Sequence, residues 1–476
     1  MSHLIPLNRS ERAYAALEGL AGSVTQVYEM SFERPLDAQR VRRAFRELVS
    51  AYPRTRMRLA VGAFSTRLGL LGDDDPMLVP LFDEAFRVVE GVAGDDERLA
   101  AYRDALLSES FSLGRSLPVR VRFANHPTRP TLFFIVHHLV CDGRGMIQMI
   151  DALLGALAGQ PITPVPLTLH EMRRALWPKG FVRRVRAAWL DFRRRRAARR
   201  EARGVTLVDP LAPLPAFTAP RVVRHTLSIP VAQLVKTARA HGTSLTALTL
   251  AALTAVLARR SQAASDGSRE VALRLSVDLR PYFDPPQPDA FGNLVATFMV
   301  RCTRFAERAP LIADIAAQLK EGTRRFKDHE RGWGLLLDEL GTLIGLRLYS
   351  LAARRLKARN RLTPMSAHYS TVGSVDHLLR HDVGLVDIAG YAPNTGLFVT
   401  SMGFRDQLRM AVIYPTGALD REQALWLAQE LETTLARMSE PEQASDETEE
   451  PWEDSAARRM VRAPSEQAQS RSAGSV

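Results

Sequence analysis

The chain has 476 residues, of which 46% are hydrophobic and 24% charged, an ordinary globular composition that is long enough for two domains. Its two cysteines, Cys141 and Cys302, exclude a disulfide framework and a CxxC pair, and we expect a reducing compartment. The formal net charge is +12, but Arg173–Arg203 alone holds thirteen basic and two acidic residues, so the rest of the chain is close to neutral and any charge argument concerns this segment alone.

Helix and strand signals alternate over the first hundred residues. Asn8–Gly19 predicts a short helix without a full capping box. Val24–Phe32 alternates like a strand, and Asp37 is placed to cap a helix that Pro53 ends. Asp95–Ser108 predicts a further helix.

The most informative stretch follows a predicted hairpin of Leu117–Phe123 with Thr131–Val136. The second of these strands is entirely apolar, β-branched or aromatic, as expected of a buried strand. It leads into His137 and His138, and then into Asp142-Gly143. Histidine pairs and Asp-Gly turns are also common in purely structural turns. However, a rigid apolar strand is a suitable support for a general base, because imidazole titrates near neutral pH.

The basic segment comes after a helix predicted at Met146–Leu157. One helical face of this segment carries an apolar stripe: Phe181, Val185, Trp189 and Phe192. Three interpretations remain open for Arg173–Arg203, namely a solvated connecting helix, an interfacial helix on an anionic membrane, or a docking surface for an acidic carrier protein. No nucleic-acid reader motif accompanies the charge, so nucleic acid is not an expected partner.

The second half of the chain begins with a Pro-rich linker at Val205–Ala219. Two strands, Glu270–Val277 and Val295–Cys302, then flank Arg280 and Gly292-Asn293. The other strands predicted are Val222–Leu227, Tyr369–Val375, Leu397–Ser401 and Leu408–Tyr414. The helices predicted are Val231–His241, a long helix that starts at Thr243 or Ser244 and runs through Arg260, Leu311–Lys327, Gly332–Arg361 and a final helix from Asp420 to about Met438. From Ser439 the composition is that of a disordered tail.

The string His137-His138-x-x-x-Asp142-Gly143 resembles the signature of the chloramphenicol-acetyltransferase-like acyltransferases, a superfamily that includes the condensation domains of peptide synthetases. Weaker resemblances lie at Tyr52–Leu59, Ala240–Thr246 and the Leu-Arg-Pro and Gly-Asn phrases around Arg280 and Asn293. The chain lacks the Asn-Val-Pro-Gly phrase of wax-ester synthases and the Asp-Phe-Gly-Trp-Gly element of plant acyltransferases. The resemblance therefore implies a stand-alone member that has diverged from both branches.

The resemblance implies an α/β (α+β) fold with two similar lobes, each a mixed sheet flanked by helices, and an active-site tunnel between them. The domains expected are an N-terminal lobe at 1–172 that carries the motif, a basic segment and linker at 173–219, a C-terminal lobe at 220–438 and a disordered tail at 439–476.

The resemblance also implies residue roles. His138 would be the catalytic general base, and Arg280 would pair with Asp142 to fix the turn that positions it. His137, Asp142, Gly143, Arg280 and Asn293 are the expected structural support of the site. Cys141 lies at a variable position of the motif and is discounted as a nucleophile. No metal and no bound cofactor are expected, and the expected co-substrate is acyl-CoA or a phosphopantetheinyl carrier thioester. No acyl-enzyme is needed, since the thioester is already activated.

The function expected is acyl transfer from a CoA or carrier-protein thioester to an acceptor hydroxyl. The alternatives are a stand-alone condensation enzyme that forms an amide, or a catalytically degenerate docking protein. The partners expected are the thioester donor, an alcohol or amine acceptor, and an acyl carrier protein or an anionic membrane surface that contacts Arg173–Arg203. The N-terminus shows no apolar stretch of signal-peptide length, so we expect a cytoplasmic enzyme, with the inner membrane surface as a peripheral location.

Overall fold

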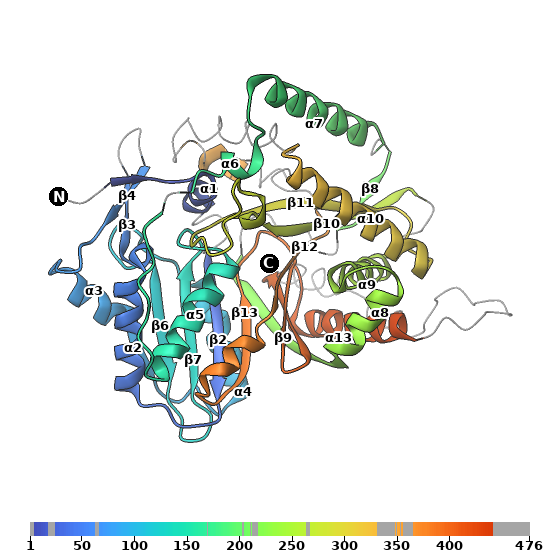
Figure 1. Cartoon of the computed structure of the whole chain (residues 1–476). Helices are drawn as coiled ribbons and strands as arrows, with labels where there is room; N and C mark the ends of the chain where they lie inside the picture. The colour runs from blue at the N-terminus through green and yellow to red at the C-terminus, as the bar shows by residue number, and fades with distance from the viewer. Residues whose placement is uncertain are drawn as a thin grey trace, which may run out of the picture. The chain divides into compact units, whose positions relative to one another are not determined.

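Two mixed β-sheets, each covered by helices, make up the body of the structure, which is a computed structural model (Figure 1). The structure describes residues 4–17, 24–61, 66–168, 170–201, 204–209, 211, 218–262, 267–330, 348, 350–352, 354–355 and 365–440. The expected α/β architecture of mixed sheets flanked by helices is confirmed.

The N-terminal sheet is built around the predicted motif strand. Its order is β13-β2-β7-β6-β5, with bounds Leu385–Tyr391, Thr25–Phe32, Thr131–His137, Val119–Ala124 and Phe86–Val89. Strands β6 and β7 form the predicted antiparallel hairpin, whereas β5 and β6 run parallel. Every residue of β2 and β7 is buried, so this apolar pair is the centre of the lobe.

Alternate residues of β7 face two different cores, as the period of a strand requires. Phe134 and its alternate neighbours pack with α2 (Ala38–Ala51) and α5 (Gly143–Leu157). Phe133 and Ile135 face the other way, and they pack with α4 (Asp96–Ser108) and with strands of the second sheet. This shared core joins the two lobes.

The predicted cap of α2 is present, side-chain caps also begin two other helices, and the first helix needs one correction. Asp37 caps α2, Asp95 caps α4 and Ser244 caps α9 (Leu245–Arg260) through side-chain oxygens that accept backbone N–H bonds. The expectation that the first helix, α1 (Arg9–Leu17), lacks a capping box is wrong. Asn8 Oδ1 accepts from Glu11 N at 2.9 Å and Glu11 Oε2 accepts from Asn8 N at 2.7 Å, which makes Asn8 the cap.

The C-terminal sheet has the order β11-β10-β12-β14-β15-β9, and β8 pairs with β10. The bounds are Val295–Cys302, Arg269–Asp278, Ala367–Ser374, Phe398–Phe404, Gln407–Pro415, Pro220–Pro230 and, for β8, Thr206–Leu207. The predicted hairpin of β14 with β15 is present. The predicted linker at Val205–Ala219 therefore contains a short paired strand within its described part.

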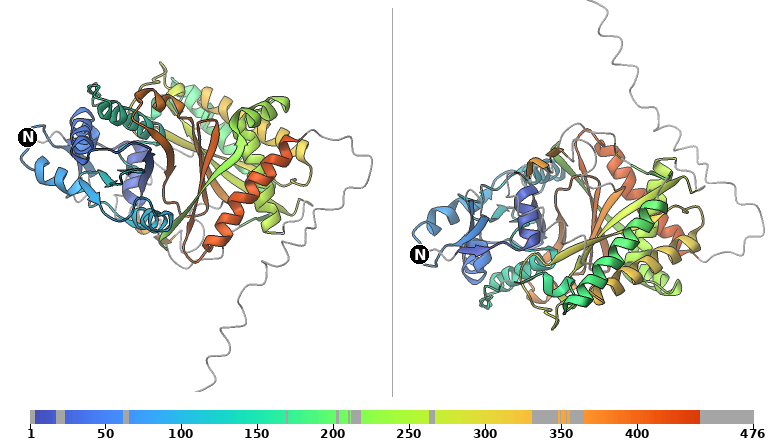
Figure 2. Two further views of the ribbon diagram at one scale, coloured as in Figure 1. Left: turned by 90° about the horizontal axis from the view of Figure 1, so that it is seen from below. Right: turned by 90° about the horizontal axis from the view of Figure 1, so that it is seen from above.

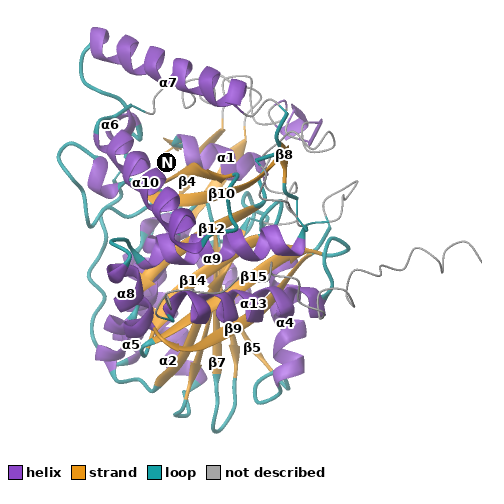
Figure 3. Cartoon of the chain, turned by 90° about the vertical axis from the view of Figure 1, so that its right-hand side faces the viewer, coloured by secondary structure: helices purple, strands orange, loops and turns teal. Residues whose placement is uncertain are grey.

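Helices cover the outer face of this sheet, namely α8 (Val231–Ala240), α9, α10 (Arg308–Lys327) and α13 (Arg421–Ser439) (Figures 2 and 3). Helix α9 is almost entirely buried, as its apolar run predicts. No single helix within the described residues has the length and apolar content to cross a bilayer; α8 and α9 reach that limit only as a pair bent by 90°.

Strand β13 comes from the second half of the chain but belongs to the N-terminal sheet. Although it follows β12 in the chain, β13 pairs antiparallel with β2 and completes the N-terminal sheet (Figure 1). Buried Glu29 on β2 reinforces the junction, because it accepts from Arg103 on α4 at 2.7 Å and from Arg224 on β9 at 2.8 Å. The range expected to form the C-terminal lobe, 220–438, thus contributes one strand to the N-terminal sheet.

The remaining described elements lie outside the two main sheets and the helices that cover them. They are a small sheet of β1 (Leu4–Pro6), β4 (Thr66–Leu70) and β3 (Met57–Val61), the helices α3 (Leu78–Ala85), α6 (Arg173–Leu176) and α7 (Phe181–Glu201), and 3-10 turns at Pro53–Arg56, Arg280–Tyr282 and Asp376–His381. The helix predicted at Gly332–Arg361 and the tail predicted from Ser439 lie largely outside the described residues.

Candidate active site

His138 lies immediately after β7, where the buried strand ends. Its backbone N–H donates to Val24 O at 2.8 Å, and its side chain is half-buried. Asn293 Nδ2 donates to His138 O at 2.6 Å and lies 3.0 Å from His138 Nδ1. On another side, Tyr14 of α1 stacks on the imidazole with a centroid separation of 4.0 Å and an interplanar angle of 9°. Segments far apart in the chain therefore hold this ring.

The surroundings of His138 favour its neutral form. Burial lowers its pKa from 6.5 to about 4, although ring hydrogen bonds to the backbone carbonyls of His138 and Cys141 and the negative charge of Asp142 oppose this. Burial also raises the pKa of the stacked Tyr14 phenol to about 12. At neutral pH the imidazole is uncharged, and one of its nitrogens carries a lone pair that can accept a proton.

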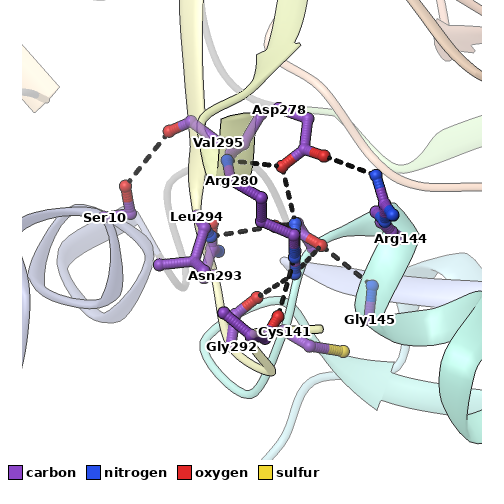
Figure 4. Close-up of polar contacts among 12 residues, drawn as sticks. Ser10, Cys141, Arg144, Gly145, Asp278, Arg280, Gly292, Asn293, Leu294 and Val295 are labelled. Carbon is purple, nitrogen blue, oxygen red and sulfur yellow. Dashed lines mark hydrogen bonds and ion pairs between the residues drawn. The ribbon is translucent and has the colours of Figure 1, made fainter. Parts of the chain in front are cut away.

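Asp142 and Arg280 form the contact expected from the resemblance. Figure 4 shows Arg280 among its polar contacts, between Asp278 and Gly292. Arg280 Nη1 donates to Asp142 Oδ2 at 2.9 Å and Nη2 donates to Oδ1 at 3.1 Å. The same carboxylate caps α5 by accepting from Gly145 N at 2.9 Å, and it accepts from Leu294 N at 2.8 Å. Asp142 thus joins the turn after His138 to the loop before β11. Its partner Arg280 is completely buried, with 0% of its surface exposed.

The loop before β11 brings Asn293 to His138. Gly292 has φ +144°, a conformation that side chains rarely adopt. Its carbonyl accepts from Asp142 N and from Arg280 Nη2, both at 3.3 Å. The backbone bonds of Gly292 and Leu294 to the Asp142–Arg280 pair hold the intervening Asn293 against the histidine.

Gly143 of the motif and Gly145, two residues after it, have a packing role that the sequence did not reveal. A Cβ at Gly145 would lie 2.6 Å from Cys141 Cβ, and one at Gly143 would lie 3.0 Å from Val372 Cγ1. Both glycines belong to the first turn of α5, which begins three residues earlier than the periodicity predicted. The absent side chains therefore make room for neighbouring protein atoms.

His137 and Cys141 point into the protein. His137 is fully buried as the last residue of β7, and its Nδ1 accepts from Leu139 N at 3.1 Å. Cys141 is also fully buried, and burial raises the pKa of its thiol well above its usual value, which keeps sulfur in the weakly nucleophilic thiol form.

A second histidine belongs to the electrostatic surroundings of His138, and sequence reasoning missed it. Burial lowers the pKa of His368 on β12 to about 3, with further contributions from Arg274 and His138. Asn394 Nδ2 lies 2.7 Å from His368 Nδ1, and Ser276 Oγ lies 2.9 Å from Nε2. No motif marks His368 or Tyr14, and only the packing of distant segments brings them to the site.

The described residues contain no cluster of three His, Cys, Asp or Glu side chains that could hold a metal ion. His138 is not among the residues that line the two cavities described in the structure. One of about 860 Å³ is lined by the C-terminal parts of α2 and α5 and by the segment that follows α5, including Ser50 and Gln160. The other, of about 180 Å³, is lined by residues that include Glu33 and Leu379. The tunnel between the lobes stays a prediction.

Comparison with known proteins relates the chain to others through its fold. No family model matches the sequence, and no curated protein matches it. Among solved structures, it is similar to the first condensation domain of the calcium-dependent antibiotic synthetase in complex with a substrate analogue, with a TM-score of 0.63 and 16% identity over 92% of this chain and 97% of that one. The trichothecene 15-O-acetyltransferase of Fusarium sporotrichioides gives a TM-score of 0.65 and 13% identity over 90% and 95%.

A third similar structure is the EpoB cyclization-docking bidomain from Sorangium cellulosum, with a TM-score of 0.62 and 17% identity over 92% of this chain and 85% of that one. At these identities the likeness concerns the fold. The expected resemblance to condensation domains and chloramphenicol-acetyltransferase-like acyltransferases is confirmed at that level, and with it the two-lobed architecture.

Proposed function

We propose that this chain, which has the fold shared by condensation domains and chloramphenicol-acetyltransferase-like acyltransferases, transfers an acyl group from a thioester to an acceptor hydroxyl. His138 is the general base in this proposal. The observation that carries it is the state of the His138 ring, which is uncharged at neutral pH, oriented by Asn293 and stacked on Tyr14.

The proposed reaction needs one base and no covalent intermediate on the enzyme. A ring nitrogen of His138 accepts the proton of the acceptor hydroxyl while the oxygen attacks the thioester carbonyl. The tetrahedral intermediate then collapses, the C–S bond breaks, and the departing thiolate takes the proton from the imidazolium. Cys141 takes no part, because its thiol is fully buried and its pKa is raised.

Asp142 and Arg280 serve the reaction by position in this scheme. Their charges neutralise each other within a network that involves Asp278, which bonds Arg280 at 2.8 Å and Arg144 at 3.0 Å. The network fixes the turn that follows His138 and the loop that carries Asn293. Gly145 N already donates to Asp142, so this backbone amide is not the oxyanion donor.

The donor in this proposal is acyl-CoA or an acyl group on a phosphopantetheinyl carrier protein, and the acceptor is an alcohol. Amide formation is the second candidate, because several of the similar structures are condensation domains of peptide synthetases. The same neutral imidazole would accept a proton from an attacking amine. The protein would need no bound cofactor in either case.

Mass spectrometry of products tests the proposal. The purified chain is incubated with a panel of acyl-CoA and acyl-carrier thioesters against alcohol and amine acceptors, and ester or amide products are identified. We expect ester products with wild-type protein and a loss of roughly 10²–10⁴-fold in their rate with His138→Ala. Amides as the only products would favour the second candidate. Equal turnover by a folded His138→Ala variant would remove His138 from the chemistry.

A further inference from the structure

Helix α7 turns an apolar stripe outward. Phe181 is 80% exposed, Val182 78%, Val185 52%, Trp189 54% and Phe192 49%. At 100° per residue these five side chains share one side of the helix. Monomeric proteins rarely expose so many large apolar side chains in one continuous row.

The opposite side of α7 is the one that contacts the protein, and two ion pairs attach it there. Asp191 is buried and accepts from Arg325 of α10 at 2.9 Å, and Arg194 donates to Glu330 at 2.6 Å. Ala187, one turn before Asp191, is also buried. The usual amphipathic arrangement is therefore reversed, because ion pairs attach the helix to its own lobe while its apolar side is left outside.

Exposed arginines lie beside the stripe and continue beyond it. Arg186 and Arg193 flank the apolar row, and Arg196 and Arg200 extend it toward the C-terminal end of the helix. The guanidinium of Arg193 lies 4.7 Å from the ring centroid of Trp189. Figures 1 and 3 both place α7 at the outer edge of the structure, beyond β10 and α10. The helix thus offers apolar side chains with cations around them on a projecting surface.

We propose that α7 lies on the surface of an anionic lipid bilayer, with Phe181, Val185, Trp189 and Phe192 inserted at the interface and the flanking arginines at the level of the headgroups. Interfacial helices bind through this combination of an apolar face and basic flanks. The ion pairs with Arg325 and Glu330 keep the helix attached to the lobe while its outer face meets lipid.

The charge and shape of α7 distinguish a bilayer from other occupants. A second copy of the chain would bring two arginine-rich surfaces together, which like-charge repulsion opposes. An acidic carrier protein would match the charge, but a single projecting helix with no described cavity beside it presents little concave surface for a folded partner. A bilayer needs no complementary shape and receives the stripe along its length.

Vesicle co-sedimentation of the full chain tests the proposal independently of any activity. Vesicles of phosphatidylcholine alone are compared with vesicles of phosphatidylcholine and phosphatidylserine in equal parts, at low and high salt. We expect binding to the anionic vesicles that salt weakens. Arg196→Gln/Arg200→Gln should weaken it roughly 25-fold, since each arginine near the surface contributes about fivefold. The matched control, Arg40→Gln/Arg43→Gln on α2, removes the same charge and should bind like wild type.

A second variant tests the apolar stripe. Trp189→Ser/Phe192→Ser changes exposed side chains only, so we expect an unchanged melting temperature and a loss of vesicle binding of at least about tenfold. Absence of wild-type binding to anionic vesicles at low salt overturns the proposal. If the α2 control lost as much vesicle binding as the α7 variant, binding would be nonspecific charge attraction, and this result would also overturn the proposal. Binding to an acidic acyl carrier protein without vesicle binding would assign the surface to a protein partner.

Discussion

The Asp142–Arg280 pair provides the sharpest test of how the site is held together. Arg280 is 0% exposed, and both of its terminal nitrogens donate to the Asp142 carboxylate. Removal of one partner of a buried ion pair leaves the other charge uncompensated, at a cost of about 3–5 kcal/mol. We therefore expect Asp142→Asn and Arg280→Met each to lower the free energy of unfolding by that order.

The structure also predicts which substitution costs more. After Asp142→Asn, Arg280 still meets the Asp278 carboxylate at 2.8 Å and Ala290 O at 2.7 Å. After Arg280→Met, Asp142 retains the backbone donors of Gly145 and Leu294 but has no cation. Asp142→Asn should therefore fall at the lower end of the range, and Arg280→Met at the upper end.

Urea unfolding, monitored by tryptophan fluorescence, gives the free energy of unfolding of the wild type, the two single variants and the double variant, which together form a double-mutant cycle. The double variant should be less destabilised than the sum of the singles by about 0.5–3 kcal/mol, because the second substitution removes a charge that is already uncompensated. The exposed pair of Arg42 with Asp83 is the control, for which we expect a coupling below about 1 kcal/mol. Additive effects at Asp142 and Arg280 would refute the reasoning, since residues in direct contact within one network must couple.

The remaining predictions concern the histidines and a glycine. His138→Ala should keep the fold and lower turnover roughly 10²–10⁴-fold. His137→Ala, at a fully buried position, should lower the melting temperature at least as clearly as the rate. A stable His137→Ala protein without turnover, beside an active but destabilised His138→Ala protein, would exchange the two roles. The pKa of His138 is lowered to about 4, so activity should stay level as the pH falls through the ordinary histidine pKa of about 6.5. Activity should be lost near pH 4, where the imidazole becomes protonated. A profile of kcat/KM that falls near pH 6.5 would contradict this. Gly145→Ala should destabilise the protein, because the new Cβ would meet Cys141 Cβ at 2.6 Å, while Gly72→Ala, with open space around it, should be close to neutral in a thermal melt.

Much of the local structure follows from the sequence because its causes are local. A strand such as Thr131–Val136 is recognised from an unbroken apolar run, and the start of α2 from an aspartate that can accept two backbone N–H bonds. The capping box of α1 has a local cause as well, because Asn8 and Glu11 have the spacing that it requires, although the first helix is expected to lack one.

The pairing of Asp142 with Arg280 was expected before the structure was known, but not from any local feature of the sequence. Nothing in composition or periodicity relates two residues 138 positions apart, and the expectation came from the resemblance. The role proposed for His138 also came from the resemblance, whereas its lowered pKa is known only from the structure. The burial that lowers it comes from segments that pack around the strand end, and Tyr14 and Asn293, which fix the ring, belong to two of them.

Only the tertiary structure decided which distant residues meet. It placed β13 in the sheet of the other lobe and His368 in the surroundings of His138. The sequence by itself determined that Phe181, Val185, Trp189 and Phe192 share one face of a basic helix, since that depends on the helical period alone. Whether that face turns toward the core or toward solvent depends on contacts between elements, and the ion pairs of Asp191 and Arg194 with α10 and Glu330 turned it outward.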